Sequence, residues 1–168
     1  MCGIAGFWDN TSLKNKRGIL NEMANAISHR GPDDVGYFEN DIGVALTHRR
    51  LSILDLSSAG HQPMESNDKN LVIVFNGEIY NYKEIAEDLK SKGIVFKTHT
   101  DTEVILNAYK VYGKGCLKYF NGMFAFAILD KSKNKILLVR DQLGIKPLYY
   151  TQEGDNIFFA SELKSIFS

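Results

Sequence analysis

Leu71-Val72-Ile73-Val74-Phe75 is an unbroken apolar run near the middle of the chain. Strands that are buried on both faces read as continuous apolar runs, whereas half-exposed strands alternate apolar with polar residues. The run therefore predicts a central strand that has protein packed on each side. Asn76 and Gly77 follow it directly, and we expect the strand to end there.

Strands outnumber helices on both sides of this run. Strand-like segments lie at 2–8, 35–39, 42–48, 123–129, 136–140, 147–150 and 157–160. Helical spacing or helix start and stop signals mark 19–29, 81–93, 100–113 and 162–167. Most strands are separated by short polar turns, so the sheets should be largely antiparallel, with helices on their outer faces. The fold class is therefore α+β.

The composition limits the class of partner. The 168 residues are 44% hydrophobic, and 20 Lys and Arg balance 20 Asp and Glu. This describes one domain with its own core and no basic excess, so neither nucleic acid nor a membrane is an expected partner. The N-terminus lacks a signal peptide, and two cysteines are too few for a disulfide framework, so we expect a cytoplasmic protein. The four histidines show no ligand spacing, and no metal site is predicted.

Cys2 directly follows the initiator methionine. One interpretation is that a small residue simply stands there. The other is chemical, because methionine aminopeptidases remove Met1 before small residues and leave a free α-amine beside the thiol. An α-amine has a pKa of about 8, so it can accept the thiol proton near neutral pH. Cys2 is thus a candidate nucleophile that carries its own base, whereas Cys116 is expected to pack in or beside the core.

Three further features admit both a structural and a chemical interpretation. Asn76-Gly77 fits a hairpin turn, but its side-chain amide and backbone N–H groups also suit an oxyanion site. Arg49 and Arg50 should project to opposite faces of a strand, so only one can face a given pocket, where its guanidinium would suit a carboxylate. Asp101 in a first helical turn is favoured by the helix dipole alone.

Six stretches occur in the order seen in glutamine-dependent asparagine synthetases, and together they span the chain. The chain resembles the N-terminal glutaminase domain of these enzymes, a class II amidotransferase of the N-terminal-nucleophile (Ntn) hydrolase superfamily. The stretches are Met1-Cys2-Gly3-Ile4-Ala5-Gly6, His29-Arg30-Gly31-Pro32-Asp33, Arg50-Leu51-Ser52-Ile53, Asn76-Gly77-Glu78-Ile79-Tyr80-Asn81, Gly122-Met123-Phe124-Ala125-Phe126-Ala127 and Arg140-Asp141-Gln142-Leu143-Gly144-Ile145-Lys146-Pro147-Leu148-Tyr149-Tyr150.

The resemblance implies a single domain over residues 1–168 with the Ntn hydrolase fold, a four-layer αββα sandwich of two mostly antiparallel sheets. It implies that Cys2 attacks the side-chain amide of L-glutamine and that Asn76 and the Gly77 N–H form the oxyanion hole. The glutamyl thioester is then hydrolysed to glutamate, and ammonia is released without a cofactor. The implied substrate-binding residues are Arg50, Leu51, Ser52, Ile53, Asn76, Gly77, Glu78 and Asp101, with Arg50 holding the α-carboxylate and Glu78 and Asp101 the α-ammonium.

In the family that the chain resembles, a C-terminal synthetase domain uses ATP and Mg to convert aspartate into asparagine. The Ser-Gly-Gly-Leu-Asp-Ser loop of that domain does not occur here. The expected partners are therefore L-glutamine and a synthetase domain in cis or in trans, with a homodimer as an option for the full-length protein. Two alternatives remain: an amidotransferase that supplies ammonia to a sugar acid in surface-polysaccharide synthesis, and a catalytically silent module that binds glutamine or a partner protein.

Overall fold

The structure is a computed structural model that describes residues 1–11, 13, 15–51 and 60–168. Two antiparallel sheets face each other. The first has the strand order β2 (Asp34–Glu39), β3 (Val44–Arg50), β1 (Gly3–Trp8), β9 (Asn156–Ala160) and β8 (Tyr149–Glu153). The second has the order β4 (Met64–Glu65), β5 (Leu71–Ile79), β6 (Gly122–Asp130) and β7 (Lys135–Arg140). We call them the β1 sheet and the β5 sheet.

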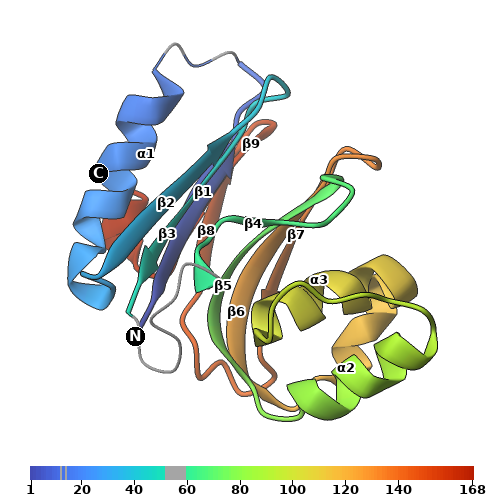
Figure 1. Ribbon diagram of the computed structural model, residues 1–168. Helices are drawn as coiled ribbons and strands as arrows, with labels where there is room; N and C mark the ends of the chain where they lie inside the picture. The colour runs from blue at the N-terminus through green and yellow to red at the C-terminus, as the bar shows by residue number, and fades with distance from the viewer. Residues whose placement is uncertain (12, 14, 52–59) are drawn as a thin grey trace.

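Helices cover the outer face of each sheet, which gives the expected αββα order (Figure 1). Helix α1 (Lys16–Ala26) lies on the β1 sheet, and α2 (Tyr82–Ser91) and α3 (Asp101–Tyr112) lie on the β5 sheet. Short 3-10 turns occupy Ser28–Arg30, Gly113–Tyr119 and Leu163–Ser165. In the part of the chain that the structure describes, no helix combines the length and apolar character needed to cross a membrane.

Three apolar layers hold the four structural layers together. Ile4, Val72 and Val74 belong to the layer between the sheets. Ala5 and Phe7 instead pack against α1, and Ile73 and Phe75 pack against the helices on the other side. Successive side chains of β1 and β5 therefore alternate between two buried faces, as strand geometry requires. The apolar run at 71–75 is therefore continuous because its strand is buried on both faces, as the sequence predicts.

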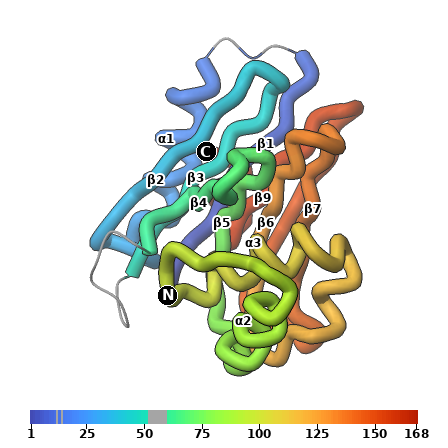
Figure 2. Tube along the Cα trace, turned by 45° about the vertical axis from the view of Figure 1, so that its right-hand side comes forward, coloured from blue at the N-terminus to red at the C-terminus, as the bar shows by residue number. Residues whose placement is uncertain are grey.

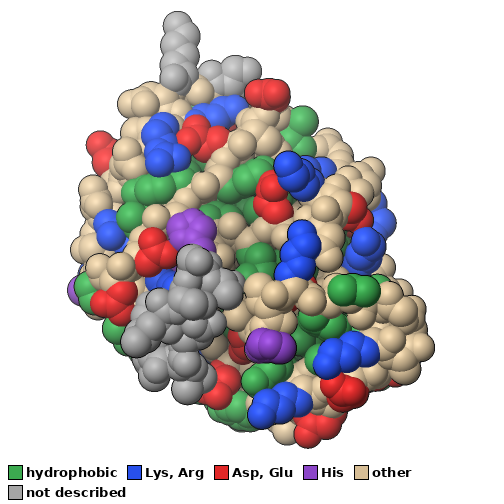
Figure 3. All heavy atoms as spheres, in the orientation of Figure 1, with side chains coloured by type: hydrophobic (Ala, Val, Ile, Leu, Met, Phe, Trp, Pro, Cys, Tyr) green, Lys and Arg blue, Asp and Glu red, His purple; other side chains and the backbone are tan. Residues whose placement is uncertain are grey.

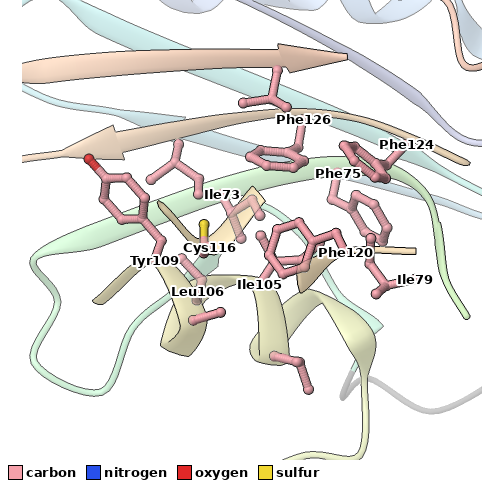
Figure 4. Close-up of a cluster of buried hydrophobic side chains, with 14 of the residues drawn as sticks. Ile73, Phe75, Ile79, Ile105, Leu106, Tyr109, Cys116, Phe120, Phe124 and Phe126 are labelled. Atoms are coloured by element: carbon pink, nitrogen blue, oxygen red, sulfur yellow. The ribbon is translucent and has the colours of Figure 1, made fainter. Parts of the chain in front are cut away.

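The layer beneath α2 and α3, part of which is drawn in Figure 4, contains more buried aromatic side chains than either of the other two layers. Phe120, Phe124 and Phe126 lie within 6.4 Å of one another by ring centroids. Cys116 is fully buried among these apolar side chains, and burial raises the pKa of its thiol to about 11. Its expected role in core packing is confirmed.

Several element boundaries differ from the sequence prediction. Strand β5 does not end at Phe75 but continues to Ile79, because β6 pairs with it along its whole length from Leu71↔Asp130 to Ile79↔Gly122. The hairpin-turn interpretation of Asn76-Gly77 is therefore wrong. Strand β8 begins two residues later than expected, after Pro147, which has no N–H to donate to a ladder. The two-residue strand β4 was not predicted, and the expected helix at 162–167 is only a 3-10 turn.

Both predicted interior helix starts lie where expected, but their side chains act differently. Thr100 caps α3 by accepting a hydrogen bond from the backbone N–H of Glu103. The Asn81 side chain leaves α2 uncapped and instead bridges the backbone of Tyr119 and Asn121. This bridge ties the end of β5 to the start of β6, just beyond the Asn76-Gly77 pair.

The visible surface carries charges of both signs. Figure 3 shows Lys and Arg side chains interspersed with Asp and Glu side chains on that face, without a large patch of one sign.

Figure 2 places the N-terminus, where β1 begins, at the same end of the molecule as the helices that cover the β5 sheet. That end of the molecule holds the candidate site.

Candidate active site

A cleft of about 610 Å³ opens between the two sheets where β1 begins, a volume typical of small-molecule sites. Every predicted site residue in the described part of the chain lines it; Ser52 and Ile53 lie outside the described residues. A smaller hollow of about 260 Å³ beside β4 contains none of them. The cleft is lined by Met1, Cys2, His48, Arg50, Leu51, Gly60, Gln62, Phe75, Asn76, Gly77, Glu78, Tyr82, His99, Thr100, Asp101, Thr102, Met123 and Lys146.

Cys2 approaches the cleft from the β1 sheet. It precedes Ile4 by two residues, so its side chain continues the face of β1 that looks toward the β5 sheet. The backbone N–H of Leu51 donates to Cys2 Sγ at 3.4 Å, and the thiol lies 3.8 Å from the Leu51 carbonyl oxygen. The thiol is half-buried and points toward the substrate-sized space.

Arg30 fixes the backbone of the same residue. Its Nε–H donates to the carbonyl oxygen of Cys2 at 2.9 Å, and its Nη1 donates to Glu162 Oε1 at 3.0 Å. Burial raises the pKa of the Glu162 carboxyl, but hydrogen bonds from Arg30, His29 and Lys164 outweigh it and lower the pKa to about 2. Arg30 therefore has an ionised partner at neutral pH, and the pair restrains the position of Cys2.

Asn76 faces Cys2 from the β5 sheet. Strand alternation places Asn76 on the same face as Val72 and Val74, which look toward the β1 sheet. Asn76 is 1% exposed, and within the described residues its Nδ2 has no hydrogen-bond partner. A buried amide N–H without a partner costs free energy, which a ligand oxygen would recover.

The Gly77 N–H points into the cleft from the edge of β5. Gly77 lies opposite Phe124 on β6, whose N–H and carbonyl both bond with Asp141 on the far side. Gly77 is thus a non-hydrogen-bonded position of the β5–β6 ladder, and its backbone groups point away from β6. A Cβ at this position would lie 2.3 Å from the Met123 oxygen and 2.7 Å from the Phe124 Cα, so only glycine fits.

The two adjacent arginines separate as strand geometry predicts. Arg49 faces α1, where its Nε donates to the Ala24 carbonyl at 3.0 Å and another guanidinium nitrogen donates to Asn25 at 2.8 Å. Arg50 lines the cleft. Gly60 lies against its guanidinium, since a Cβ at Gly60 would approach an Arg50 nitrogen to 2.3 Å. Of the two cations, Arg50 alone lines the cleft.

Two carboxylates lie at the other side of the cleft. Asp101 Oδ2 accepts from the backbone N–H of Ile79 at 3.1 Å, which ties the first turn of α3 to the end of β5. Burial raises the pKa of the Asp101 carboxyl to about 6, and the nearby Glu78 charge acts in the same direction. Both carboxylates would gain from a ligand cation between them.

Sequence reasoning missed several residues of this site. Arg30 was interpreted only as part of a turn and family motif, and Glu162 lies 132 residues away along the chain. His48 and Gln62 line the cleft as buried polar groups. His48 follows two alternate apolar positions of β3, Val44 and Leu46, and that alternation was the one signal that could have placed it between the sheets.

Comparison with known proteins identifies the family of the chain. A family model described as a glutamine amidotransferase domain matches residues 1–168. The chain is 48% identical to a glutamine-hydrolysing asparagine synthetase of Bacillus subtilis, over 100% of this chain and 22% of that protein. It is 45% identical to a putative glutamine-hydrolysing asparagine synthetase of Methanocaldococcus jannaschii, over 99% of this chain and 35% of that protein. The resemblance drawn from the six stretches is thereby confirmed.

A solved structure supports the same fold. The glutamine phosphoribosylpyrophosphate amidotransferase from B. subtilis superposes with a TM-score of 0.81 at 22% identity, over 99% of this chain and 43% of that one. This similarity confirms the expected Ntn αββα fold. The chain spans between about a fifth and about a third of the length of the two asparagine synthetase relatives described above. Since the family model matches the whole chain, the protein belongs to the family of glutamine amidotransferase domains.

Proposed function

We propose that this chain hydrolyses the side-chain amide of L-glutamine to glutamate and ammonia, with Cys2 as the nucleophile after Met1 is removed. One observation carries the proposal: the thiol of Cys2 and a buried Asn76 N–H, which has no partner in the described part of the chain, line one cleft from opposite sheets. A thiol nucleophile beside preorganised N–H donors is the arrangement that acyl transfer requires.

The cleft also complements the other end of the substrate. The Arg50 guanidinium suits the α-carboxylate of an amino acid, and Glu78 and Asp101 suit its α-ammonium. Leu51 adds a backbone N–H close to the nucleophile. The proposed substrate therefore is an L-amino acid whose side-chain amide extends toward Cys2.

The reaction follows from these groups. The α-amine of Cys2 takes the thiol proton, and the thiolate adds to the amide carbon. Asn76 Nδ2–H and the Gly77 N–H donate to the resulting oxyanion. The α-ammonium returns the proton to the leaving nitrogen, so that the C–N bond breaks, ammonia leaves and a glutamyl thioester forms. Water then adds to the thioester, and glutamate is released with the thiol restored. No metal or organic cofactor takes part in this scheme.

The test is a rate measurement on protein whose N-terminal residue is Cys2, checked by mass spectrometry. Incubation with L-glutamine should release glutamate and ammonia in equal amounts, and L-asparagine, which is one methylene shorter, should be hydrolysed far more slowly. Tight glutamine binding without ammonia release would contradict the proposal and favour a silent glutamine-binding module.

We further propose that the ammonia serves asparagine synthesis in a cytoplasmic, full-length protein. The names of the relatives support this acceptor over a sugar acid. A synthetase domain would bind ATP, Mg and aspartate, and the full-length protein is the form in which a homodimer would be sought. The test is asparagine formation from glutamine, aspartate and ATP by the full-length protein. Glutamine hydrolysis without asparagine formation in this assay, together with amide formation when a sugar acid replaces aspartate, would contradict this assignment.

Arg50→Ala is expected to raise the KM for glutamine by roughly 10- to 100-fold, because a charge-assisted contact to the α-carboxylate is lost. Arg49→Ala is the matched control, since Arg49 bonds to α1 outside the cleft. Its KM should stay near that of the wild type, with a small loss of thermal stability. Steady-state kinetics on both variants measures this, and equal changes in KM would mean that Arg50 does not hold the substrate.

Glutamine binding is expected to weaken below about pH 6. The Asp101 pKa of about 6 means that its carboxyl becomes neutral as the pH falls and no longer attracts the α-ammonium. At pH 5, roughly one-tenth of Asp101 is ionised, so the Kd should rise by about 10-fold relative to pH 7.5. Calorimetry on the processed Cys2→Ala protein measures binding without turnover. Asp101→Asn should bind weakly at both pH values, whereas Asp155→Asn on an exposed turn should keep the wild-type profile.

A further inference from the structure

Strand β4 is shorter than the strand it pairs with, and this leaves the edge of β5 without a partner strand beside the cleft. The two pair only at Met64↔Ile73 and Glu65↔Val72. Continued in the same register, residue 62 would lie opposite Phe75. Without a strand at that position, the N–H and carbonyl groups of Phe75 that face the edge would be buried with no hydrogen-bond partner. Unpaired buried backbone groups destabilise the folded state.

Two side chains take the place of the missing strand at Phe75. The Phe75 N–H donates to Gln62 Oε1 at 2.6 Å, and the Phe75 carbonyl is 3.1 Å from His48 Nε2. Because a carbonyl can only accept, His48 carries its proton on Nε2. His48 is 1% exposed and Gln62 is 6% exposed, so both bonds are shielded from water.

The bonded carbonyl belongs to the peptide group that joins Phe75 to Asn76. His48 comes from β3 in the facing sheet, so its bond links the two sheets at the peptide group that immediately precedes Asn76. Burial lowers the pKa of the His48 imidazole to about 4, which keeps it neutral and able to donate from one defined nitrogen. Further along the same edge, Asp101 accepts from the N–H of Ile79.

Gly77 stands between these two fixed points, and its N–H points to the same open edge. Among the residues that the structure describes, the edge is thus bonded at Phe75 and at Ile79 and remains open at Gly77. We propose that His48 and Gln62 are positioning residues for the oxyanion site: by holding the Phe75–Asn76 peptide group in place of a strand, they aim Asn76 Nδ2 and the Gly77 N–H at one oxygen. This inference rests on the proposed glutamine hydrolysis.

His48→Leu removes the donor and keeps an apolar side chain in the buried position. We expect kcat to fall by roughly 10- to 100-fold, because small displacements of catalytic groups cost about this much. The KM should stay within about threefold of wild type, and the Kd for glutamine in the Cys2→Ala background should not change. His48→Gln, whose amide nitrogen can reach the same carbonyl, should recover most of the lost kcat.

Thr47→Val is the matched control for stability. Thr47 is also fully buried on β3, and its hydroxyl donates to the Gly36 carbonyl at 2.9 Å, outside the cleft. The Thr47→Val variant loses a side-chain-to-backbone hydrogen bond of the same kind as His48→Leu does. Its melting temperature should fall, while its kcat per folded molecule should not change. Gln62→Met is a second test variant in case His48→Leu does not fold. It should also lower kcat while leaving the Kd for glutamine unchanged.

These measurements distinguish a failure of the positioning role from a failure of the proposed glutamine hydrolysis. Wild-type kcat in a folded His48→Leu or Gln62→Met protein would overturn the positioning role and leave glutamine hydrolysis standing. A loss confined to KM and Kd would also overturn it, because the residue would then contact substrate directly. A wild-type protein that releases no ammonia would instead contradict the proposed function itself.

Discussion

Cys2→Ala is expected to abolish glutamine hydrolysis, with a loss of roughly 10⁴-fold or more, as is found when a catalytic nucleophile is removed. The variant lacks the atom that forms the thioester, while its α-amine, oxyanion donors and charged groups remain. Alanine is also small, so Met1 should still be removed and the two proteins differ only at the sulfur. Ammonia release measures the rate, and calorimetry should show that the variant still binds glutamine.

Cys116→Ala is the matched control for this prediction. Its thiol is fully buried in the layer under α2 and α3 and has a pKa of about 11, so it contributes no thiolate near neutral pH. Its rate should equal that of the wild type, with a stability loss of about 1–2 kcal/mol from the small cavity. Equal rates for Cys2→Ala and wild type would remove Cys2 from the mechanism.

The alternation of buried faces was predictable from the sequence because it depends on local pattern. The apolar run at 71–75 identified a strand packed on both faces, and the paired arginines at 49 and 50 had to project oppositely. The strand end was misplaced because Asn76 and Gly77 are turn formers by local preference. The ladder with β6 outweighs that preference along the whole strand.

The supporting groups of the site were not predictable for a different reason. Contacts such as His48 with Phe75 and Arg30 with Glu162 join segments far apart in the chain, and they depend on how the sheets stack. Neither residue type nor spacing indicates which buried polar groups will meet. The predicted residues were found because family motifs mark them, whereas the groups that hold them in place became visible only with the register and the layer order.

Retention of Met1 is expected to suppress hydrolysis by roughly 10²- to 10⁴-fold, the contribution typical of a general base. With Met1 attached, the nitrogen of Cys2 is an amide and cannot accept the thiol proton. The Met1 side chain also lines the cleft, where Lys146 Nζ lies 3.6 Å from its sulfur. A fusion protein that a protease cleaves directly before Cys2 allows the rate to be measured before and after release in one sample.

The same fusion separates the two effects of Met1. If the residue before Cys2 is changed by Met1→Gly, the side chain leaves the cleft but the amide remains. Because the α-amine serves as the base in our mechanism, this protein should stay inactive until it is cleaved, and cleavage should restore the full rate. Activity in the uncleaved glycine form would show that Met1 acts only by filling the cleft, and another group would then have to take the thiol proton. A cleaved Cys2→Ala fusion controls for the protease and should remain inactive throughout.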